Sequence, residues 1–353
     1  MDTKETLKRY KRDIDSELRR FFDSRINRVE SIDSSASELI NNLKDFTMNG
    51  GKRIRPILLI FGYKAVGGID EKEIIKASLC VELMQSFLLI HDDIIDDDDL
   101  RRGNPTVHKV YENMYKRAPV DSKKLGRDMG IITGDIVSVL GSEAIMNTDF
   151  PPELKVKALD KFNRVIINTC FGQMLDVLSE TSTDIKEEDI AKIHKLKSAI
   201  YTIEGPLHIG AILGEANENQ LNVLTEFAIS LGQAFQLQDD ILGMFGTAET
   251  TGKQVGNDLR EGKKTLLIKK ALDKANNKDK KVIMKCLGNK NILKKDIEKV
   301  KEIIVKTGSL DYSKELAKEM VMKAKSCLVN GDFKKEGKDF LLGLADYVVE
   351  REY

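Results

Sequence analysis

Apolar residues recur every three or four positions through most of the chain, and this spacing constrains its fold more than any other feature. Residues 71–96 place isoleucine, leucine and phenylalanine on one helical stripe, and residues 221–246 do the same. Such a period is typical of helices that bury one face. Alternating apolar and polar residues with hairpin turns, which indicate strands, are nearly absent. The sequence therefore predicts an all-α domain of ten or more helices.

Length and composition favour a single domain over residues 1–353. The chain is 41% hydrophobic, which is enough for a large core. Neither a shift in composition nor an internal repeat of fixed period marks a boundary. Residues 271–300 are rich in lysine and asparagine, and we interpret them as a mobile connection between helices.

The charge balance argues against polyanionic partners. Lysine plus arginine and aspartate plus glutamate each number 57, so the formal net charge is zero. No global basic field exists to attract nucleic acid or an anionic membrane, and we expect no nucleic-acid partner. The charged N-terminus has no apolar signal segment, and no run of about 18 apolar residues predicts a membrane span. The cysteines lie far apart without a CxxC pair, which argues against zinc and favours a reducing cytoplasm: Cys80, Cys170, Cys286 and Cys327.

The stretch "LLIHDDIIDDDDLRRG" (Leu88 to Gly103) joins an apolar helical pattern directly to six aspartates. On a helix, Asp92 and Asp96 lie one turn apart and share a face, as do Asp93 and Asp97. Like charges at that spacing repel each other, so we expect a positive group to offset them. Stacked carboxylates suit Mg²⁺, which keeps waters and phosphate oxygens among its ligands.

Two arginines, Arg101 and Arg102, follow the aspartates, and metal and arginines together would bind a phosphate-containing anion. An acidic run by itself is more often a solvated surface. An EF-hand calcium loop is disfavoured because its ligand spacing and central glycine are missing. A second cluster, Asp239 and Asp240 in "FQLQDDILG", also ends an apolar helix. The repeated pattern predicts two facing helices that share metal ions across a cleft.

Basic residues on glycine-rich segments complete the pattern. Glycines allow the backbone to approach a phosphate closely, and lysine adds a point charge. Neither segment has the Walker A spacing, so an NTPase is poorly supported. The segments are "GGKRIRP", with Lys52, Arg53 and Arg55 after Gly50–Gly51, and "TGKQVGNDLREGKKT", with Lys253, Lys263 and Lys264.

Taken in order, these motifs resemble those of trans-isoprenyl diphosphate (polyprenyl) synthases. The set is "GGKRIRP", "HDDIIDDDDLRRGNPTVH", "GQMLD", "AFQLQDDILG" and "TGKQVGNDLREGKKT", and the resemblance spans roughly residues 40–270. A lone DDxxD would also occur in terpene cyclases, whereas the complete ordered set is specific. The short first motif and "DDILGMFG" look most like archaeal short-chain enzymes of the geranylgeranyl diphosphate synthase type.

The resemblance implies an all-α bundle around a deep central cavity. It implies a Mg²⁺-dependent, head-to-tail condensation of isopentenyl diphosphate with dimethylallyl, geranyl or farnesyl diphosphate. The steps would be ionisation, condensation and elimination, with mainly geranylgeranyl diphosphate as product. It further implies three Mg²⁺ ions per active site, a homodimer and a cytoplasmic location.

Individual roles are also carried over from the family. Asp92, Asp93, Asp96, Asp239 and Asp240 would hold metal, and the catalytic set would be Asp92, Asp96 and Asp239 with Lys197 and Gln236. Lys52, Arg55 and Arg102 would hold isopentenyl diphosphate. Arg101, Lys197, Lys253 and Lys263 would hold the allylic diphosphate. Ser198 and Gln236 would also bind substrate, with Gln236 near the reacting centre. Asp93, Asp240 and Asp258 would have a supporting role.

The chain departs from the family pattern at two positions. Gln85 stands where many members have histidine, and its amide can still donate to a phosphate. Gly243 stands where many members have a third aspartate, so the second motif lacks the carboxylate four residues after Asp239. We expect activity to survive both changes.

Product length is predicted from the helix that carries Asp92. Phe87 and Leu88 precede it by five and four residues, which places them about 6–8 Å deeper along the helix axis. In the family, a single aromatic residue five positions before the motif goes with geranylgeranyl products. We therefore interpret Phe87 with Leu88 as the floor of the product tunnel, although Phe87 as ordinary core is the simpler reading. His91 is expected to be structural.

Other functions stay open at this stage. The product could instead be farnesyl or geranylfarnesyl diphosphate. A terpene cyclase would explain the aspartates, but not "GGKRIRP" or the paired arginines. A non-catalytic regulatory subunit would usually have lost the aspartate pairs, which this chain retains. Turnover of isopentenyl diphosphate by the isolated chain would separate these readings.

Overall fold

The described residues are mostly helical, as the sequence predicts. The structure, a computed structural model, describes residues 2–181, 186–246 and 255–349. Within these residues the only strands are β1 (Leu100–Arg101) and β2 (Asn104–Pro105), which form one short antiparallel hairpin. The chain divides into two compact units, Met1–Phe162 with Pro206–Ala216, and Asn163–Gly205 with Asn217–Tyr353. The single domain over 1–353 stays a prediction.

The first unit contains the "GGKRIRP" segment and the first aspartate motif. Its helices α1 and α2 pack on each other and on α4, and α4 packs against α3 and α6. Helix α7 begins in this unit and continues into the second. The helices of the first unit are α1 (Thr3–Val29), α2 (Ser34–Met48), α3 (Ile54–Ala65), α4 (Glu71–Ile95), α5 (Val107–Met114), α6 (Ser122–Met146), α7 (Pro152–Thr181) and α9 (Gly205–Leu213).

The first aspartate motif lies at the C-terminal end of helix α4, whose two ends are well defined. The Asp70 side chain caps its start by accepting a hydrogen bond from the Glu73 backbone N–H at 3.1 Å. The helix ends at Ile95, and Asp96 is its C-cap. Asp97 follows in a left-handed conformation with φ 55°. The expectation that Asp97 shares a helical face with Asp93 is therefore wrong, because the chain has already left the helix.

Helices α4 and α6 are each long and apolar enough to cross a membrane by length and composition, with mean hydropathy of 1.5 and 1.4 over an 18-residue window. This differs from the expectation that no such segment exists. The window in α4 is 67% buried inside the protein. Core helices of water-soluble proteins pass the same test, so the finding is weak evidence for a span.

Helices α3 and α9 approach each other closely at glycines. A Cβ atom on Gly62 would lie 2.3 Å from the Leu207 carbonyl oxygen, and one on Gly210 would lie 1.8 Å from that of Leu59. Only glycine leaves room for the two backbones at this distance. The contact fixes α3, whose first turn contains the last residues of "GGKRIRP".

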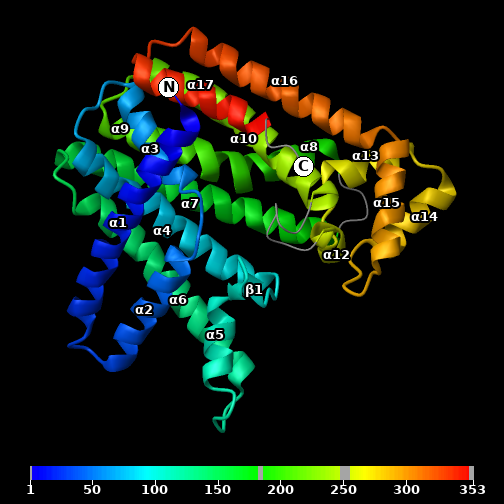
Figure 1. Cartoon of the computed structure of the whole chain (residues 1–353), viewed down its shortest axis with the longest axis horizontal. Helices are drawn as coiled ribbons and strands as arrows, with labels where there is room; N and C mark the ends of the chain where they lie inside the picture. Colours follow the sequence, from blue (N-terminus) through cyan, green and yellow to red (C-terminus); the bar gives the residue numbers. More distant parts are fainter. Residues whose placement is uncertain (1, 182–185, 247–254, 350–353) are drawn as a thin grey trace. The chain divides into compact units, whose positions relative to one another are not determined.

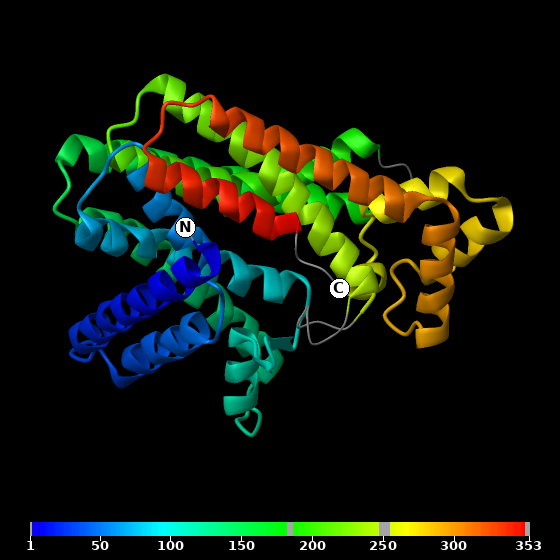
Figure 2. The same cartoon turned by 45° about the horizontal axis from the view of Figure 1, so that its top comes forward.

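The second unit is built around α10, which carries the second aspartate pair. Helix α16 runs along α10, and the two lie side by side in both views (Figures 1 and 2). An apolar core joins α10 to helices α12–α15. Besides the end of α7, the second unit contains α8 (Glu187–Ile193), η1 (His194–Glu204), α10 (Glu218–Phe245), α12 (Asn257–Glu261), α13 (Leu266–Lys274), α14 (Asn277–Cys286), α15 (Lys294–Lys306), α16 (Ser309–Val329) and α17 (Lys335–Val349).

The prediction of a mobile connection over residues 271–300 is wrong. Helices α13, α14 and α15 occupy most of it, and Ile283, Ile297 and Val300 are buried in the core cluster. The lysines lie on the outer faces of short amphipathic helices. Composition was a poor guide here because each helix buries only a narrow apolar stripe.

Candidate active site

The carboxylates at the end of α4 surround one arginine. Arg101 donates from Nε to Asp93 Oδ1 at 2.8 Å and also pairs with it through Nη2. Its Nη2 lies 3.7 Å from Asp92 Oδ2 and 3.8 Å from Asp98 Oδ2. Burial raises the pKa of Asp93 to about 6 despite the lowering effect of Arg101. Arg101 is therefore the positive group that the stacked aspartates were expected to need.

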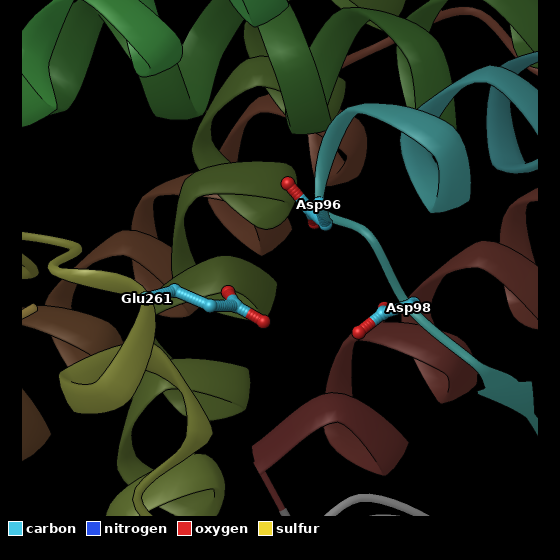
Figure 3. Close-up of side chains that lie close together, drawn as sticks. All are labelled: Asp96, Asp98 and Glu261. Atoms are coloured by element: carbon cyan, nitrogen blue, oxygen red, sulfur yellow. The ribbon is translucent and has the colours of Figure 1, made fainter. Parts of the chain in front are cut away.

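The same cluster has the chemistry of a divalent-cation site. One carboxylate oxygen of Asp96 lies within 4.8 Å of one of Asp98, and Figure 3 shows both side chains on the segment where α4 ends. Asp93 Oδ2 is buried and accepts no hydrogen bond. Since all of these donors are carboxylate oxygens, the set fits a hard cation such as Mg²⁺ or Ca²⁺. Asp98 was not predicted as a site residue, because it lies beyond the DDxxD spacing.

Arg102 lies against the glycine pair of "GGKRIRP". Its Nη1 donates to the Asn49 carbonyl oxygen at 2.9 Å, and a Cβ on Gly51 would lie 3.2 Å from Nη1. Desolvation, with the neighbouring cations Arg53, Arg101 and Arg55, lowers the pKa of Arg102. Several guanidinium groups gathered in this way favour an anionic ligand.

The predicted partners of Arg102 lie near the same glycine-rich segment. Lys52 is exposed at the start of the loop, and Arg55 is partly buried in the first turn of α3. Gln85 is partly buried on α4. These placements are compatible with the isopentenyl diphosphate roles, which stay predictions.

Arg53, by contrast, is a buried brace. Its side chain is 0% exposed, donates to Asp15 at 2.8 Å and pairs with Glu82. Although burial opposes the charge, Glu82 and Asp15 raise the pKa of Arg53. The residue has φ 54° at the start of α3. Sequence reasoning grouped it with the phosphate-binding residues because nothing local marks its distant partners.

Phe87 lies on α4 below the aspartates, with only 9% of its surface exposed. His91 packs edge-on against its ring, with centroids 5.0 Å apart. His91 Nε2 lies 3.2 Å from the Ile131 carbonyl oxygen, and a Cβ on Gly134 would overlap the imidazole at 2.2 Å. These contacts hold His91, on α4, against α6, which is a structural position. Leu88, partly buried, is the neighbouring residue.

The second unit contains a polar pocket of about 130 Å³ between η1 and α10. Ser198 donates to Gln236 Oε1 at 2.6 Å, and Gln236 Nε2 donates to Asp240 Oδ1 at 2.8 Å. His194 Nε2 lies 3.5 Å from Asp240 Oδ2. Lys197 pairs with Asp176 of "GQMLD" at 2.6 Å. The pocket thus brings together predicted residues that are far apart in the sequence.

The helix η1 that lines this pocket is a π-helix of 11 residues. π-Helical turns are rare, and they are frequently found at functional sites. The wider turn places Lys197 and Ser198 on the pocket wall together with His194, which the sequence analysis did not assign. Nothing in residue spacing distinguishes a π-helix from an α-helix, so this geometry could not be predicted.

The remaining predicted residues of the second unit are placed as follows. Lys263 lines the pocket and pairs with Glu261 at 2.5 Å, and the Glu261 side chain at the end of α12 appears in Figure 3. Asp239 is partly exposed on α10 beside the buried Asp240. Lys253 lies outside the described residues.

The structure gives an account of the departure at Gly243. A Cβ at this position would lie 3.0 Å from Asp258 Oδ2. The Asp258 carboxylate, which comes from α12, therefore stands beside the position where other members have an aspartate. It also lines the polar pocket.

Comparisons with known proteins identify the family of the chain. The sequence profile of the Polyprenyl synthetase family matches residues 37–305. The geranylgeranyl diphosphate synthase of Saccharolobus solfataricus is 37% identical over 273 residues, covering 76% of this chain and 77% of that protein. The geranylfarnesyl diphosphate synthase of Aeropyrum pernix is 34% identical over 307 residues, covering 86% of this chain and 91% of that protein.

A solved structure has the same fold. The geranylgeranyl pyrophosphate synthase of Corynebacterium glutamicum, complexed with isoprenyl diphosphate and magnesium, superposes with a TM-score of 0.93. The two chains share 29% sequence identity, and the match covers 98% of this chain and 99% of that one. Matched profile, relatives and fold together establish that this chain is a member of the polyprenyl synthetase family.

Proposed function

We propose that the protein condenses isopentenyl diphosphate with an allylic diphosphate, head to tail, and releases mainly geranylgeranyl diphosphate. The observation that carries this proposal is the arrangement on α4, where aspartates follow directly on an apolar helix with one buried aromatic side chain five residues before them. A diphosphate held through Mg²⁺ at the aspartates would extend its prenyl tail along the apolar side of α4. Membership of the polyprenyl synthetase family supports the same reaction class.

The first unit would bind metal ions and position the diphosphate. We propose that Asp92, Asp93 and Asp96, with Asp98 beside them, hold Mg²⁺. When bound, the ions supply Lewis-acid neutralisation of the allylic diphosphate as it leaves. Arg101 lies within 4 Å of three of these carboxylates, so it would keep them in place and add positive charge.

Isopentenyl diphosphate would bind at the other basic group of the first unit. The side chain of Arg102 is already oriented by its hydrogen bond to the Asn49 carbonyl oxygen. Lys52 and Arg55 follow Gly50–Gly51, the glycine pair that Arg102 contacts. A fixed guanidinium loses little freedom when a phosphate binds, which favours affinity.

The second unit would contribute the polar pocket. Lys197 and Lys263 would bind the allylic diphosphate, with Lys253 predicted on the same glycine-rich segment. Ser198 and Gln236, joined by a hydrogen bond, would orient groups at the reacting centre. Asp239 and Asp240 would hold further metal, for three Mg²⁺ in all. Asp240 already accepts from Gln236, which suits a supporting position.

The reaction can be tested directly by product analysis. The purified chain would be supplied with Mg²⁺, isopentenyl diphosphate and each allylic primer in turn. Mg²⁺-dependent formation of geranylgeranyl diphosphate is expected. Cyclic hydrocarbon would instead indicate a terpene cyclase, and absence of turnover would indicate a regulatory subunit.

A longer product is the second candidate. The similarity to a geranylfarnesyl diphosphate synthase favours it, whereas the buried aromatic ring on α4 favours the shorter one. The same assay distinguishes them, because the products differ by one isoprene unit.

Phe87→Ala is expected to lengthen the main product by at least one isoprene unit. Removing the ring opens the tunnel wall about 7.5 Å beyond Asp92, so the tail can grow past it. The readout is product length by chromatography. Phe162→Ala is the matched control, because it removes another buried ring of the first unit away from the motif. If both variants, or neither, changed product length, Phe87 would not be the floor.

We also propose that the protein is a homodimer joined through α6. One side of this helix exposes Ile131, Ile132, Val139 and Met146, each at least 47% accessible. Burying such a stripe against a second copy would remove apolar surface from water. Val139→Glu is therefore expected to shift the mass measured by sedimentation from twice that of the chain to that of one chain. An unchanged mass would place the contact elsewhere.

A cytoplasmic location is proposed on the basis of the cysteines. Cys80, Cys170, Cys286 and Cys327 are all free thiols in the structure. Such usage suits a reducing compartment.

A further inference from the structure

The turn between α5 and α6 has properties that the condensation reaction does not use. We call residues 114–127 the basic tip. It contains five basic residues and one acidic residue, Asp121. Three large apolar side chains are exposed on it, Met114 at 45%, Tyr115 at 41% and Val120 at 53%. The basic residues are Lys116, Arg117, Lys123, Lys124 and Arg127.

Much of this positive charge is not balanced by nearby carboxylates. Lys124 pairs with Asp128 at 2.6 Å, and Lys123 reaches Asp97 only at 3.9 Å. The other three basic residues are exposed and make no ion pair within the described part of the chain. The basic tip therefore presents net positive charge although the whole protein is neutral.

The basic tip is held in shape rather than left loose. At its base, α5 approaches α6 so closely that a Cβ on Gly126 would lie 2.4 Å from the His108 carbonyl oxygen. Asp121 caps α6 by accepting from the Lys124 backbone N–H at 3.0 Å. Tyr111 and His108 are buried beneath the tip. In both views α5 and the following turn project from the other helices of the first unit (Figures 1 and 2).

We propose that the basic tip docks the protein on an anionic lipid surface. Lysine and arginine side chains are attracted by anionic headgroups, while Tyr115, Met114 and Val120 can enter the boundary between headgroups and acyl chains. The attraction acts within roughly 10 Å at moderate ionic strength. A local cluster therefore suffices, and the zero net charge of the chain does not oppose it.

A second copy of the chain fits this surface less well. A twofold contact of the basic tip with itself would bring two sets of like charges together. A nucleic acid would satisfy the charges but would leave the aliphatic side chains without an apolar environment. The proposal does not depend on the proposed function, since it uses none of the residues assigned to the reaction.

The test is co-sedimentation of the full chain with vesicles. Vesicles of phosphatidylcholine containing phosphatidylglycerol are compared with phosphatidylcholine alone, at low and high salt. Binding is expected only to the anionic vesicles, and salt should weaken it. No sedimentation with anionic vesicles, or equal sedimentation with both kinds, would overturn the proposal.

Variants locate the contact. Each basic residue near an anionic surface contributes about a five-fold change in affinity, so Lys116→Gln with Arg117→Gln should weaken vesicle binding about 25-fold. Lys8→Gln with Arg12→Gln, an equal change of charge on the exposed face of α1, should have little effect. Equal losses in the two double variants would mean that binding is not through the basic tip.

A second pair separates lipid from other partners. Tyr115→Ser with Val120→Ser keeps the charge, and it should weaken the binding that remains at high salt. Unchanged binding by this variant would overturn the insertion of apolar side chains. A smaller mass in solution for the tip variants, without loss of vesicle binding, would assign the surface to contact between copies instead. All variants should keep condensation activity with water-soluble primers, which shows that they are folded.

Discussion

Asp92→Asn is expected to reduce turnover by about a thousand-fold or more. Metal ions that offset a leaving diphosphate contribute several kcal/mol to the barrier, and each 1.36 kcal/mol is about a factor of ten in rate. The substitution keeps the shape of the side chain but removes the negative charge that holds the cation. It also leaves Arg101 with one carboxylate fewer. Steady-state turnover over a range of Mg²⁺ concentrations measures the effect.

The matched control is Asp99→Asn, within the same run of aspartates. Asp99 is 74% exposed and pairs with Lys109 at 3.0 Å, so its loss should change turnover less than a few-fold. Near-equal effects of the two substitutions would indicate that the run acts through its overall charge. Near-parental activity of Asp92→Asn at all Mg²⁺ concentrations would remove this aspartate from the metal site.

Arg53→Met is expected to lower the free energy of unfolding by about 3–5 kcal/mol. The substitution leaves Asp15 and Glu82 without their shared partner, and removal of one member of a buried charge network typically costs this much. Chemical denaturation with far-UV circular dichroism gives the value. Substrate affinity should change only as far as the loop loses its position.

Two controls make the result specific. Lys52→Met, one residue earlier and exposed, should weaken isopentenyl diphosphate binding with little effect on stability. Replacing Asp15 and Glu82 by leucine and methionine in the Arg53→Met background should recover much of the loss, because no buried charge then stays unpaired. A loss of less than about 1 kcal/mol in the free energy of unfolding of Arg53→Met would contradict a structural role for Arg53.

Low pH should weaken the ion pair between Asp15 and Arg53. Hydrogen bonds and charge pairing with Lys11 and Arg53 outweigh burial and lower the pKa of Asp15. Its contribution to stability is therefore present above the unfolded pKa of about 3.9 and is lost as the pH falls through the lower folded value. In the Arg53→Met variant, the free energy of unfolding should therefore fall less steeply as the pH is lowered below about 4.

Predictions from short-range sequence patterns were reliable for the bounds of helices. The apolar stripe predicted α4 over 71–96, and the helix runs from Glu71 to Ile95. Gln236, one turn before Asp240, donates a hydrogen bond to it in the structure, a contact that the helical spacing permits. Prediction failed over 271–300, where a polar composition concealed helices with narrow buried stripes.

The sequence by itself determined the helical fold, the aspartates near the ends of α4 and α10, and the family, because these depend on periodicity and on residues that are close in the chain. The tertiary structure decided which charges are buried. Arg53 meets a partner 38 residues away, and so does Ser198. Contacts at such separations depend on how helices pack, and no local spacing records them. The family resemblance already left Arg53 out of the binding residues, but only the fold shows why. Arg53 is buried between Asp15 and Glu82, whereas Arg102 donates to the Asn49 carbonyl oxygen.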